Sequence, residues 1–232
     1  MNILFMTAEA APFAKVGGLG DVVAAGSLPT ALRALGTDAR VMLPLYGSID
    51  RSKFNIKPLF GFDYNRRDGN YYVTVHTTTW HDVPFYFVEA YPFFGNEGSV
   101  YTDWNWDMPR YIFFNQVAMA ASWEIQQQQD WRADVFHVND WHTGLIPFFL
   151  TESRYKSEWS HIRSMLTIHN MAHQGAHAGG WLWELGVPGR DHPELRSSGL
   201  GDNLLGIGVT YADYVTTVSP RHAEEIQYPH LG

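Results

Sequence analysis

The sequence predicts an α/β fold, a Rossmann-like domain with a mainly parallel sheet and helices on both faces. Short apolar runs alternate along the chain with longer segments in which apolar residues recur at helical spacing. The 232 residues are 45% hydrophobic and carry no internal repeat, so one large core is expected. Strands that alternate with helices favour parallel pairing through right-handed crossovers.

The beginning of the chain is expected to form a βαβ unit. A strand is predicted from Asn2 to Thr7, then a loop and a helix from about Gly18 to Leu35, which Pro29 is expected to kink. Gly36 is a natural helix stop, and Ala39 to Leu43 is the second strand. This unit starts the parallel sheet.

Between Phe54 and Val88 the hydrophobic period changes to two. Aromatic and β-branched residues alternate in Tyr71 to Thr79 and in Val83 to Val88. Turn residues stand at Arg67-Asp68-Gly69 and His81-Asp82. We interpret this region as a β-hairpin or meander inserted into the main sheet.

After a loop from Tyr91 to Asp107, which fits either a ligand-facing or a packed surface loop, helices and strands alternate again. The expected elements are a helix at Met108 to Gln128, a strand at Val135 to Val138, a helix at Thr143 to Arg154, a strand at Ser164 to Ile168, a helix at Asp202 to Tyr211 and a strand at Tyr214 to Val218. Ser219-Pro220 then predicts a final short helix with Ser as its cap.

Composition excludes several classes of function. The chain has no cysteine, which rules out disulfides and thiolate chemistry and makes the cytoplasm the expected location. A net charge of -8 without a run of Lys and Arg argues against nucleic acid or a membrane surface as partner. The apolar run Ile3 to Met6 is too short for a signal peptide or membrane span. Aromatics make up 15% of the chain, and those beside glycine-rich stretches suit either a core or the apolar faces of sugars.

Polar and glycine residues follow four of the predicted strands, at the sheet edge where ligands bind in open α/β folds. In Lys15 to Asp21, glycines permit close approach of a ligand to the backbone, and a helix start offers N–H groups to an anion. Lys15 adds positive charge, so a phosphate group is the expected ligand of this loop. The spacing is neither a Walker A loop nor a dinucleotide fingerprint, and a purely structural glycine turn remains the alternative.

The segment HVNDWHTGL places Asp140, Trp141 and His142 just past a strand. Asp140 fits either a helix N-cap or a ligand-facing carboxylate, while Trp141 fits the core and His142 the surface as alternatives. In TIHNMAHQG, an imidazole and an amide at His169 and Asn170 are able to hydrogen-bond sugar hydroxyls. Histidines there recur every four residues, but the glycines argue against a helix that would gather them on a metal ion, so no metal site is predicted.

Four blocks resemble those of the bacterial glycogen synthases and plant starch synthases: KVGGLGDVV with ARVMLPLY, HVNDWHTGL, TIHNMAHQG, and ADYVTTVSPRHAEEIQ. They occur in the family's order over nearly the whole chain. The resemblance implies a retaining glucosyltransferase of the GT-B architecture, with two Rossmann-like domains facing across a cleft and no metal or other cofactor. Residues 1–232 would be the N-terminal, acceptor-side domain of a longer protein, and the C-terminal nucleotide-sugar domain is expected to be absent.

The resemblance also implies roles for individual residues. Asp140 and His169 would be catalytic, with the role of Asp140 as base, positioner or shaping group left open. The donor and its diphosphate would be bound by Lys15, Gly17, Gly18, Asp21 and Tyr101, the last a weaker match because the segment after it departs from the family pattern. The sugar and acceptor would be bound by Trp141, His142, Asn170 and Gln174.

The implied activity is that of a hexosyltransferase. It would move glucose from ADP-glucose, or UDP-glucose, to the non-reducing end of an α-1,4-glucan with retention, once the C-terminal domain is present. One alternative is a non-catalytic glucan-binding or interaction module derived from the family. Another is a GT-B enzyme that acts on sucrose or a lipid acceptor.

Overall fold

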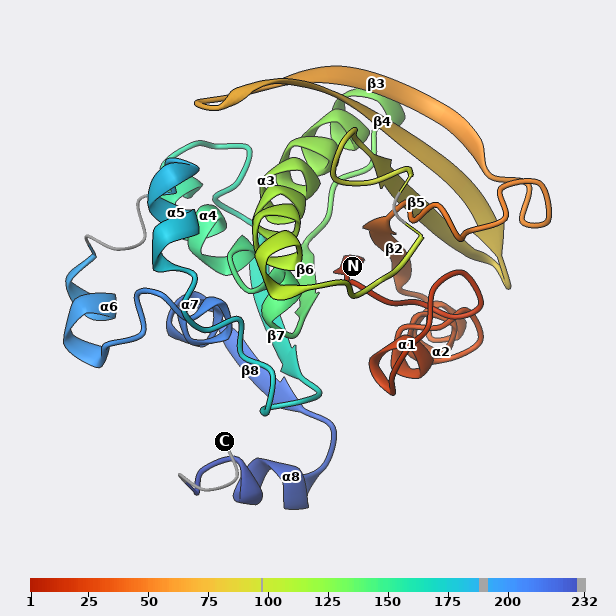
Figure 1. Cartoon of the computed structure of the whole chain (residues 1–232). Coiled ribbons are helices and arrows are strands. Elements are labelled where there is room, and N and C mark those ends of the chain that lie inside the picture. Colours follow the sequence, from red (N-terminus) through yellow and green to blue (C-terminus); the bar gives the residue numbers. More distant parts are fainter. Residues whose placement is uncertain (97, 188–191, 229–232) are drawn as a thin grey trace.

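The computed structural model describes residues 1–96, 98–187 and 192–228, and its centre is an eight-stranded sheet (Figure 1). The strand order is β3-β4-β5-β2-β1-β6-β7-β8. The bounds are β1 Asn2–Met6, β2 Asp38–Pro44, β3 Lys57–Arg66, β4 Gly69–Trp80, β5 Val83–Glu89, β6 Val135–Asn139, β7 Arg163–Ile168 and β8 Tyr214–Thr217. The pairs β5–β2, β2–β1, β1–β6, β6–β7 and β7–β8 are parallel. The pairs β3–β4 and β4–β5 are antiparallel. The predicted fold class and its hairpin insertion are therefore confirmed.

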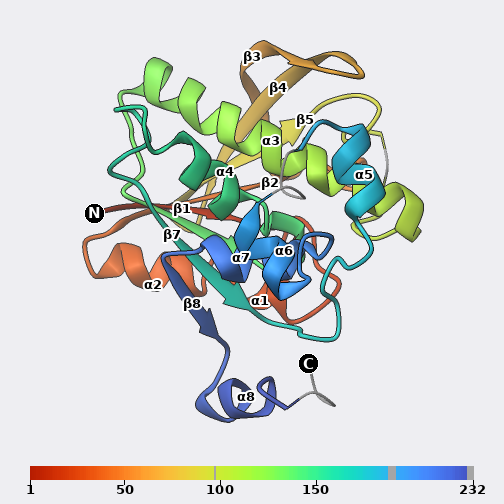
Figure 2. The ribbon, with the colours of Figure 1, turned by 90° about the vertical axis from the view of Figure 1, so that its left-hand side faces the viewer.

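Helices cover both faces of the sheet. Figures 1 and 2 show α1 and α2 on one face and α3, α4 and α7 on the other. The bounds are α1 Leu19–Val22, α2 Leu28–Ala34, α3 Trp104–Gln129, α4 Ile146–Ser153, α5 Gly179–Glu184, α6 Pro193–Ser198, α7 Leu204–Tyr211 and α8 Pro220–Glu225, with a 3₁₀ helix at Trp141–Thr143. Both faces being covered explains why β1, β2 and β6 are almost continuously apolar and buried.

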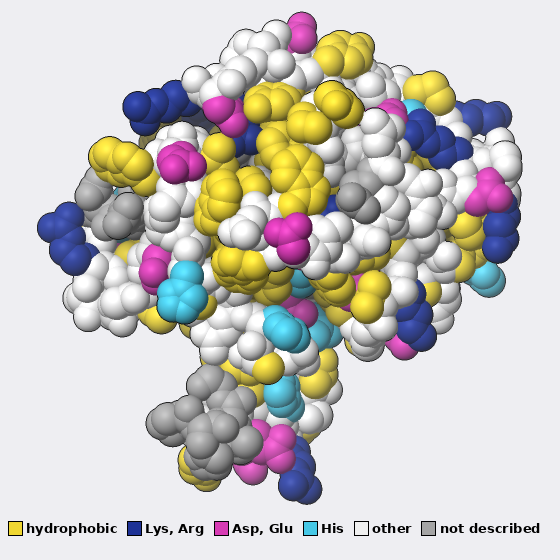
Figure 3. Space-filling view, viewed as in Figure 1, with side chains coloured by type: hydrophobic (Ala, Val, Ile, Leu, Met, Phe, Trp, Pro, Cys, Tyr) yellow, Lys and Arg dark blue, Asp and Glu magenta, His cyan; other side chains and the backbone are white. Residues whose placement is uncertain are grey.

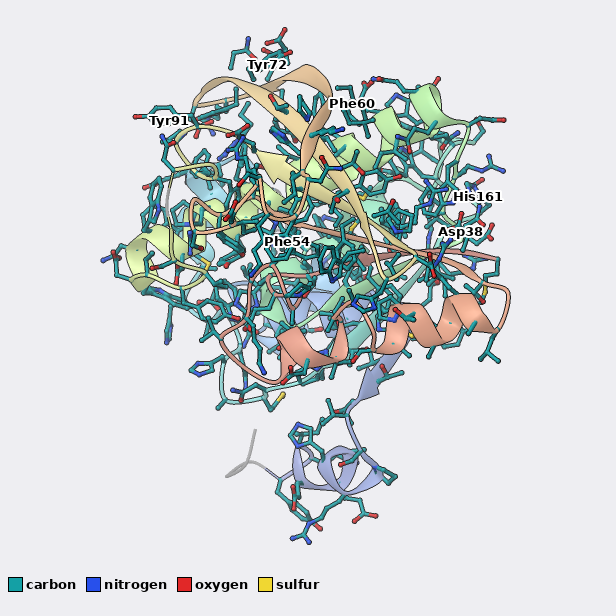
Figure 4. All side chains as sticks on the ribbon, turned by 90° about the vertical axis from the view of Figure 1, so that its right-hand side faces the viewer. Asp38, Phe54, Phe60, Tyr72, Tyr91 and His161 are labelled. Carbon is teal, nitrogen blue, oxygen red and sulfur yellow. The ribbon has the colours of Figure 1, made fainter. Side chains whose placement is uncertain are left out.

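The core is rich in aromatic rings. Phe13 packs against Phe54 and Phe85 with ring centroids 4.7 Å apart in each pair. Phe54 lies in the interior, whereas Tyr72, which is 63% exposed, lies at the outer edge of the hairpin (Figure 4). The hairpin curls over α3 (Figure 1), and Tyr71 packs on Phe113 of that helix. Many of the aromatics noted in the sequence are therefore core residues.

The prediction of one continuous first helix is wrong. The segment Gly18 to Leu35 forms two helices, because the chain turns between them at Gly26, where φ is +98°. Pro29 lies in the first turn of α2, where a missing N–H is no loss, so it helps to start a helix instead of kinking one. As a result α1 is a single turn.

The other differences concern helix ends. The helix expected from Met108 begins at Trp104, because the carboxylate of Asp103 accepts the N–H of Asn105 at 3.0 Å and caps it. The helix expected from Thr143 begins at Ile146, after the 3₁₀ turn. Helices α5 and α6 were not predicted. The final cap is confirmed, since Ser219 Oγ accepts the N–H of His222 at 3.1 Å.

Helix α8 stands out from the body at the end of β8 (Figures 1 and 2). It contributes no buried residue. Within the described part of the chain, no helix has the length and apolar character needed to cross a membrane.

Candidate active site

A cleft of about 1070 Å³ lies at the carboxyl ends of the parallel strands. It is lined by the loops that follow β1, β6 and β7, by residues near the start of α3, and by Val218 after β8. Histidine and acidic side chains gather on this side of the molecule above the protruding α8 (Figure 3). The sheet edge expected to carry the site is therefore the edge that is hollowed.

All of the predicted site residues line this cleft except Lys15 and Asp21. The Lys15 ammonium lies 2.8 Å from Asp21 Oδ1, and their side chains are 49% and 60% exposed. Gln174 lines the cleft, but its side chain donates to Met171 O at 3.1 Å and accepts from Asn203 Nδ2 at 2.7 Å. Gln174 thus also braces the loop after β7.

The glycine loop after β1 forms one wall of the cleft. A Cβ added at Gly18 would meet nothing within 4 Å, so this backbone is open to close approach. The N–H groups of Val16 and Gly17 are not free, because they donate to Glu9 Oε2 at 2.6 and 2.8 Å. With α1 only four residues long, the helix dipole that the sequence led us to expect for an anion is weak.

Glu9 was missed by the sequence analysis. Its carboxylate is 2% exposed, lines the cleft, and also accepts the hydroxyl hydrogen of Tyr101. The signal was present, since a lone acid flanked by alanines at the end of a buried strand requires partners for its charge.

Asp140 has an unusual backbone at the end of β6. Its φ is +55° and its ψ is −172°, a region that residues other than glycine rarely adopt. Its Oδ1 accepts the backbone N–H groups of His169 at 2.7 Å and Asn170 at 3.3 Å. The N-cap interpretation is therefore wrong, because the carboxylate makes no capping bond to the helix that follows.

Burial dominates the ionisation of Asp140, which is 5% exposed. Burial raises the pKa of this carboxyl to about 6, against the lowering effect of the two N–H groups, and the nearby Glu9 charge adds to the rise. At pH 7 the group is ionised, but it titrates close to neutrality.

His169 is oriented by Asn139. The Asn139 amide donates to two carbonyl groups, of Met6 at 3.1 Å and of His137 at 3.2 Å, so its Oδ1 faces His169 Nε2 at 2.9 Å. Burial lowers the pKa of His169 to about 4, partly offset by Glu9, so the ring is neutral. The proton belongs on Nε2, and within the described structure the buried Nδ1 lacks a hydrogen-bond partner. Nδ1 is therefore a buried acceptor without a partner among the described residues, and a ligand hydroxyl reaches it only if a neighbouring group moves.

Aromatic rings form a second wall. Trp141 is 5% exposed and packs on Tyr111 with ring centroids 5.4 Å apart. The rings of Tyr101 and His142 lie 5.2 Å apart. Burial, with the charge of Arg110, holds the pKa of His142 well below its usual range, so this ring is also neutral. Flat apolar rings beside hydrogen-bonding groups are typical of sugar sites.

The charges of the cleft favour a neutral, hydroxyl-rich ligand. Three acids line it, Glu9, Asp107 and Asp140, and its lining residues, all within the described structure, include no Lys or Arg. The histidines 169, 173 and 177 do not share a helix, and no cluster of metal-ligating side chains occurs among the residues described. A phosphate group would need cations from beside the cleft, such as Lys15, or from another domain.

Residues 2–232 match the family model described as the starch synthase catalytic domain. The chain belongs to this family. It is 39% identical to the glycogen synthase of Streptococcus uberis and 37% identical to that of Lachnospira eligens, with all of the chain and 48% of each relative covered. It thus spans about half the length of the curated relatives it matches.

The structure is similar to the catalytic domain of starch synthase IV from Arabidopsis thaliana, which was solved bound to ADP and acarbose. The TM-score is 0.86 at 27% identity, over all of this chain and 47% of that one. A sucrose-phosphate synthase from Thermosynechococcus elongatus shares the fold, with a TM-score of 0.53 and 13% identity over 97% of this chain and 44% of that one. The Rossmann-like half of a GT-B architecture, expected from the sequence, is thereby confirmed.

Proposed function

We propose that the chain is the acceptor-side domain of a retaining glucosyltransferase that extends an α-1,4-glucan from a nucleotide sugar, with ADP-glucose as the preferred donor. The observation that carries the proposal is the cleft itself, which is lined by acids and neutral imidazoles in a chain of this family. The similarity to a starch synthase domain solved with ADP and acarbose supports the donor and sugar classes.

The donor side of the site is assigned to the glycine loop. Gly17 and Gly18 allow the diphosphate to approach the backbone, and Lys15 neutralises charge that develops on the leaving diphosphate. Asp21, which is ion-paired with Lys15, holds its ammonium beside the loop. Tyr101 closes this side of the cleft.

The sugar side is assigned to the loops after β6 and β7. His169 contacts the transferred glucose, and Asn170 and Gln174 surround it. Trp141 and His142 lie against the apolar face of the sugar.

Transfer breaks the bond between the anomeric carbon and a diphosphate oxygen, and forms one to the acceptor's 4-hydroxyl oxygen on the same face. The hydroxyl proton passes to the departing diphosphate. The positive charge that develops on the sugar ring lies in a cleft lined by the carboxyl groups of Glu9 and Asp140, which stabilise it. The third acid, Asp107, is instead ion-paired with Arg110. Because Asp140 Oδ1 accepts two backbone N–H groups, we assign Asp140 to fixing His169 and to this electrostatic role.

We assign the part of the relatives' sequences that this chain does not cover to a C-terminal domain that binds most of the nucleotide sugar. We therefore expect no transfer by the 232-residue chain alone. Fused to the matching second half of the Streptococcus uberis enzyme, it should incorporate radiolabelled glucose from ADP-glucose into maltoheptaose, with UDP-glucose assayed in parallel.

The competing function is a non-catalytic glucan-binding module, favoured by the aromatic wall. It predicts that calorimetry detects maltoheptaose binding to the isolated chain and that the fused protein transfers no glucose. Transfer by the fusion would exclude it.

A further inference from the structure

Glu9 joins three segments that are far apart in the sequence. Glu9 lies in the loop after β1. Its Oε2 accepts hydrogen bonds from the N–H groups of Val16 and Gly17, and its Oε1 accepts one from the hydroxyl of Tyr101. We propose that Glu9 is a positioning residue that locks the glycine loop to Tyr101 and so sets the donor side of the cleft. This inference rests on the proposed function for its catalytic consequence, but the lock itself is a property of the chain.

The contacts call for a carboxylate. Both oxygens of Glu9 accept, one from the loop and one from the phenol, and hydrogen bonds to a charged acceptor are about twice as strong as neutral ones. A glutamine has one acceptor oxygen and one NH₂ group. Its oxygen is able to accept from the loop while its NH₂ group faces Tyr101, whose hydroxyl must then accept a hydrogen bond instead of donating one, and the loop N–H groups lose their charged acceptor.

The loop has little room to rearrange around Glu9. A Cβ added at Gly20 would lie 3.1 Å from Glu9 Oε2 and 3.3 Å from the Cα of Lys15. The carboxylate is thus enclosed by the backbone it holds, and a change in its bonding moves the loop that carries Lys15.

Tyr101 connects Glu9 to the aromatic wall of the cleft. Burial, then the hydrogen bond and charge of Glu9, raise the pKa of Tyr101, so its hydroxyl keeps its proton and remains a donor. Its ring lies 5.2 Å from that of His142. Glu9 therefore fixes the glycine loop relative to the sugar-facing wall without having to touch substrate.

The first test uses NMR on the 232-residue chain and needs no activity. In Glu9→Gln, the amide protons of Val16 and Gly17 should move upfield, and their hydrogen exchange should rise roughly tenfold or more as the charged acceptor is lost. The control is Glu89→Gln, which changes another hydrogen-bonded carboxylate outside the cleft and should leave both amides unchanged. Unchanged Val16 and Gly17 amides in folded Glu9→Gln would overturn the proposal.

The second test uses Tyr101→Phe, which removes only the hydroxyl and keeps the ring. In the fused enzyme, this change and Glu9→Gln should each raise the KM for ADP-glucose about tenfold and leave the KM for maltoheptaose unchanged. If the two residues act as one lock, the double variant is no worse than the worse single variant. Multiplied effects, or equal loss for both substrates, would overturn it.

Should Glu9→Gln fail to fold, Tyr101→Phe decides the same question, because loss of the phenol anchor must still shift the Val16 and Gly17 amides. Should the fused enzyme with wild-type residues be folded but transfer no glucose, while the Streptococcus uberis N-terminal half joined at the same point supports transfer, the proposed function fails. The NMR result then still tests the lock, so the two failures are distinguishable.

Discussion

The backbone of Asp140 provides a test that separates strain from side-chain chemistry. Asp140→Gly and Asp140→Ala both remove the carboxylate and the hydrogen bonds to His169 and Asn170. They differ in how easily the new residue adopts φ +55° and ψ −172°, a conformation close to a region used almost only by glycine.

Two opposing contributions set the expected difference in unfolding free energy between the two variants. Holding an alanine in this conformation costs about 1–3 kcal/mol. Alanine gains about 0.4–1 kcal/mol over glycine because its unfolded chain is less flexible. The glycine variant should therefore be more stable than the alanine variant, by about 1.3 kcal/mol at the middle of the two ranges and about 2.6 kcal/mol at most, with about 2–4 °C in Tm for each kcal/mol.

The assay is urea unfolding followed by the fluorescence of the nine tryptophans. Ala31, exposed on α2 with ordinary helical geometry, is the control, since Ala31→Gly should cost about 0.5–1 kcal/mol in the opposite direction. An Asp140→Ala variant more stable than Asp140→Gly, as an unstrained position would give, would refute the claim that the site stores backbone strain.

Three further predictions concern the glycine loop and the buried His137. Lys15→Ala should change the unfolding free energy by under about 1 kcal/mol, because its ion pair is exposed, yet should lower kcat/KM for ADP-glucose in the fused enzyme at least about tenfold. Gly18→Ala should stabilise the chain by about 0.4–1 kcal/mol but raise the KM for ADP-glucose, whereas Gly180→Ala, with equally open space, should stabilise it similarly and leave that KM unchanged. Burial lowers the pKa of His137 to about 4, so the unfolded chain binds a proton below about pH 6.5 that the folded chain excludes. Stability should fall by about 3 kcal/mol from this group as pH drops from about 6.5 to 4, and urea unfolding of His137→Gln should lack that part of the slope.

The regular part of the fold was predictable because it depends on local hydrophobic pattern. The runs that became β1, β2 and β6 are apolar because the sheet is covered on both faces, and the period of two marked the hairpin. Pro29 was misread because the turn at Gly26 precedes it, and sequence alone does not show which of several glycines adopts positive φ.

The position of the cleft was predictable from the sequence, but its hydrogen bonds were not. Strand ends located Asp140 and His169, since the carboxyl ends of parallel strands meet at one edge. The partners of the Asp140 carboxylate lie directly after β7, at His169 and Asn170, and one partner of Glu9 lies at Tyr101, so neither contact has a local signature. The roles carried over from the family resemblance remain predictions.

Glucose transfer by the fused protein tests directly whether this chain supplies half of a glucosyltransferase site. Joined to the second half of the Streptococcus uberis enzyme, the chain should incorporate glucose from ADP-glucose into maltoheptaose, and Lys15→Ala should lose most of that activity. The proposed function would be contradicted if the fusion were folded and inactive while the Streptococcus uberis N-terminal half, joined at the same point, supported transfer.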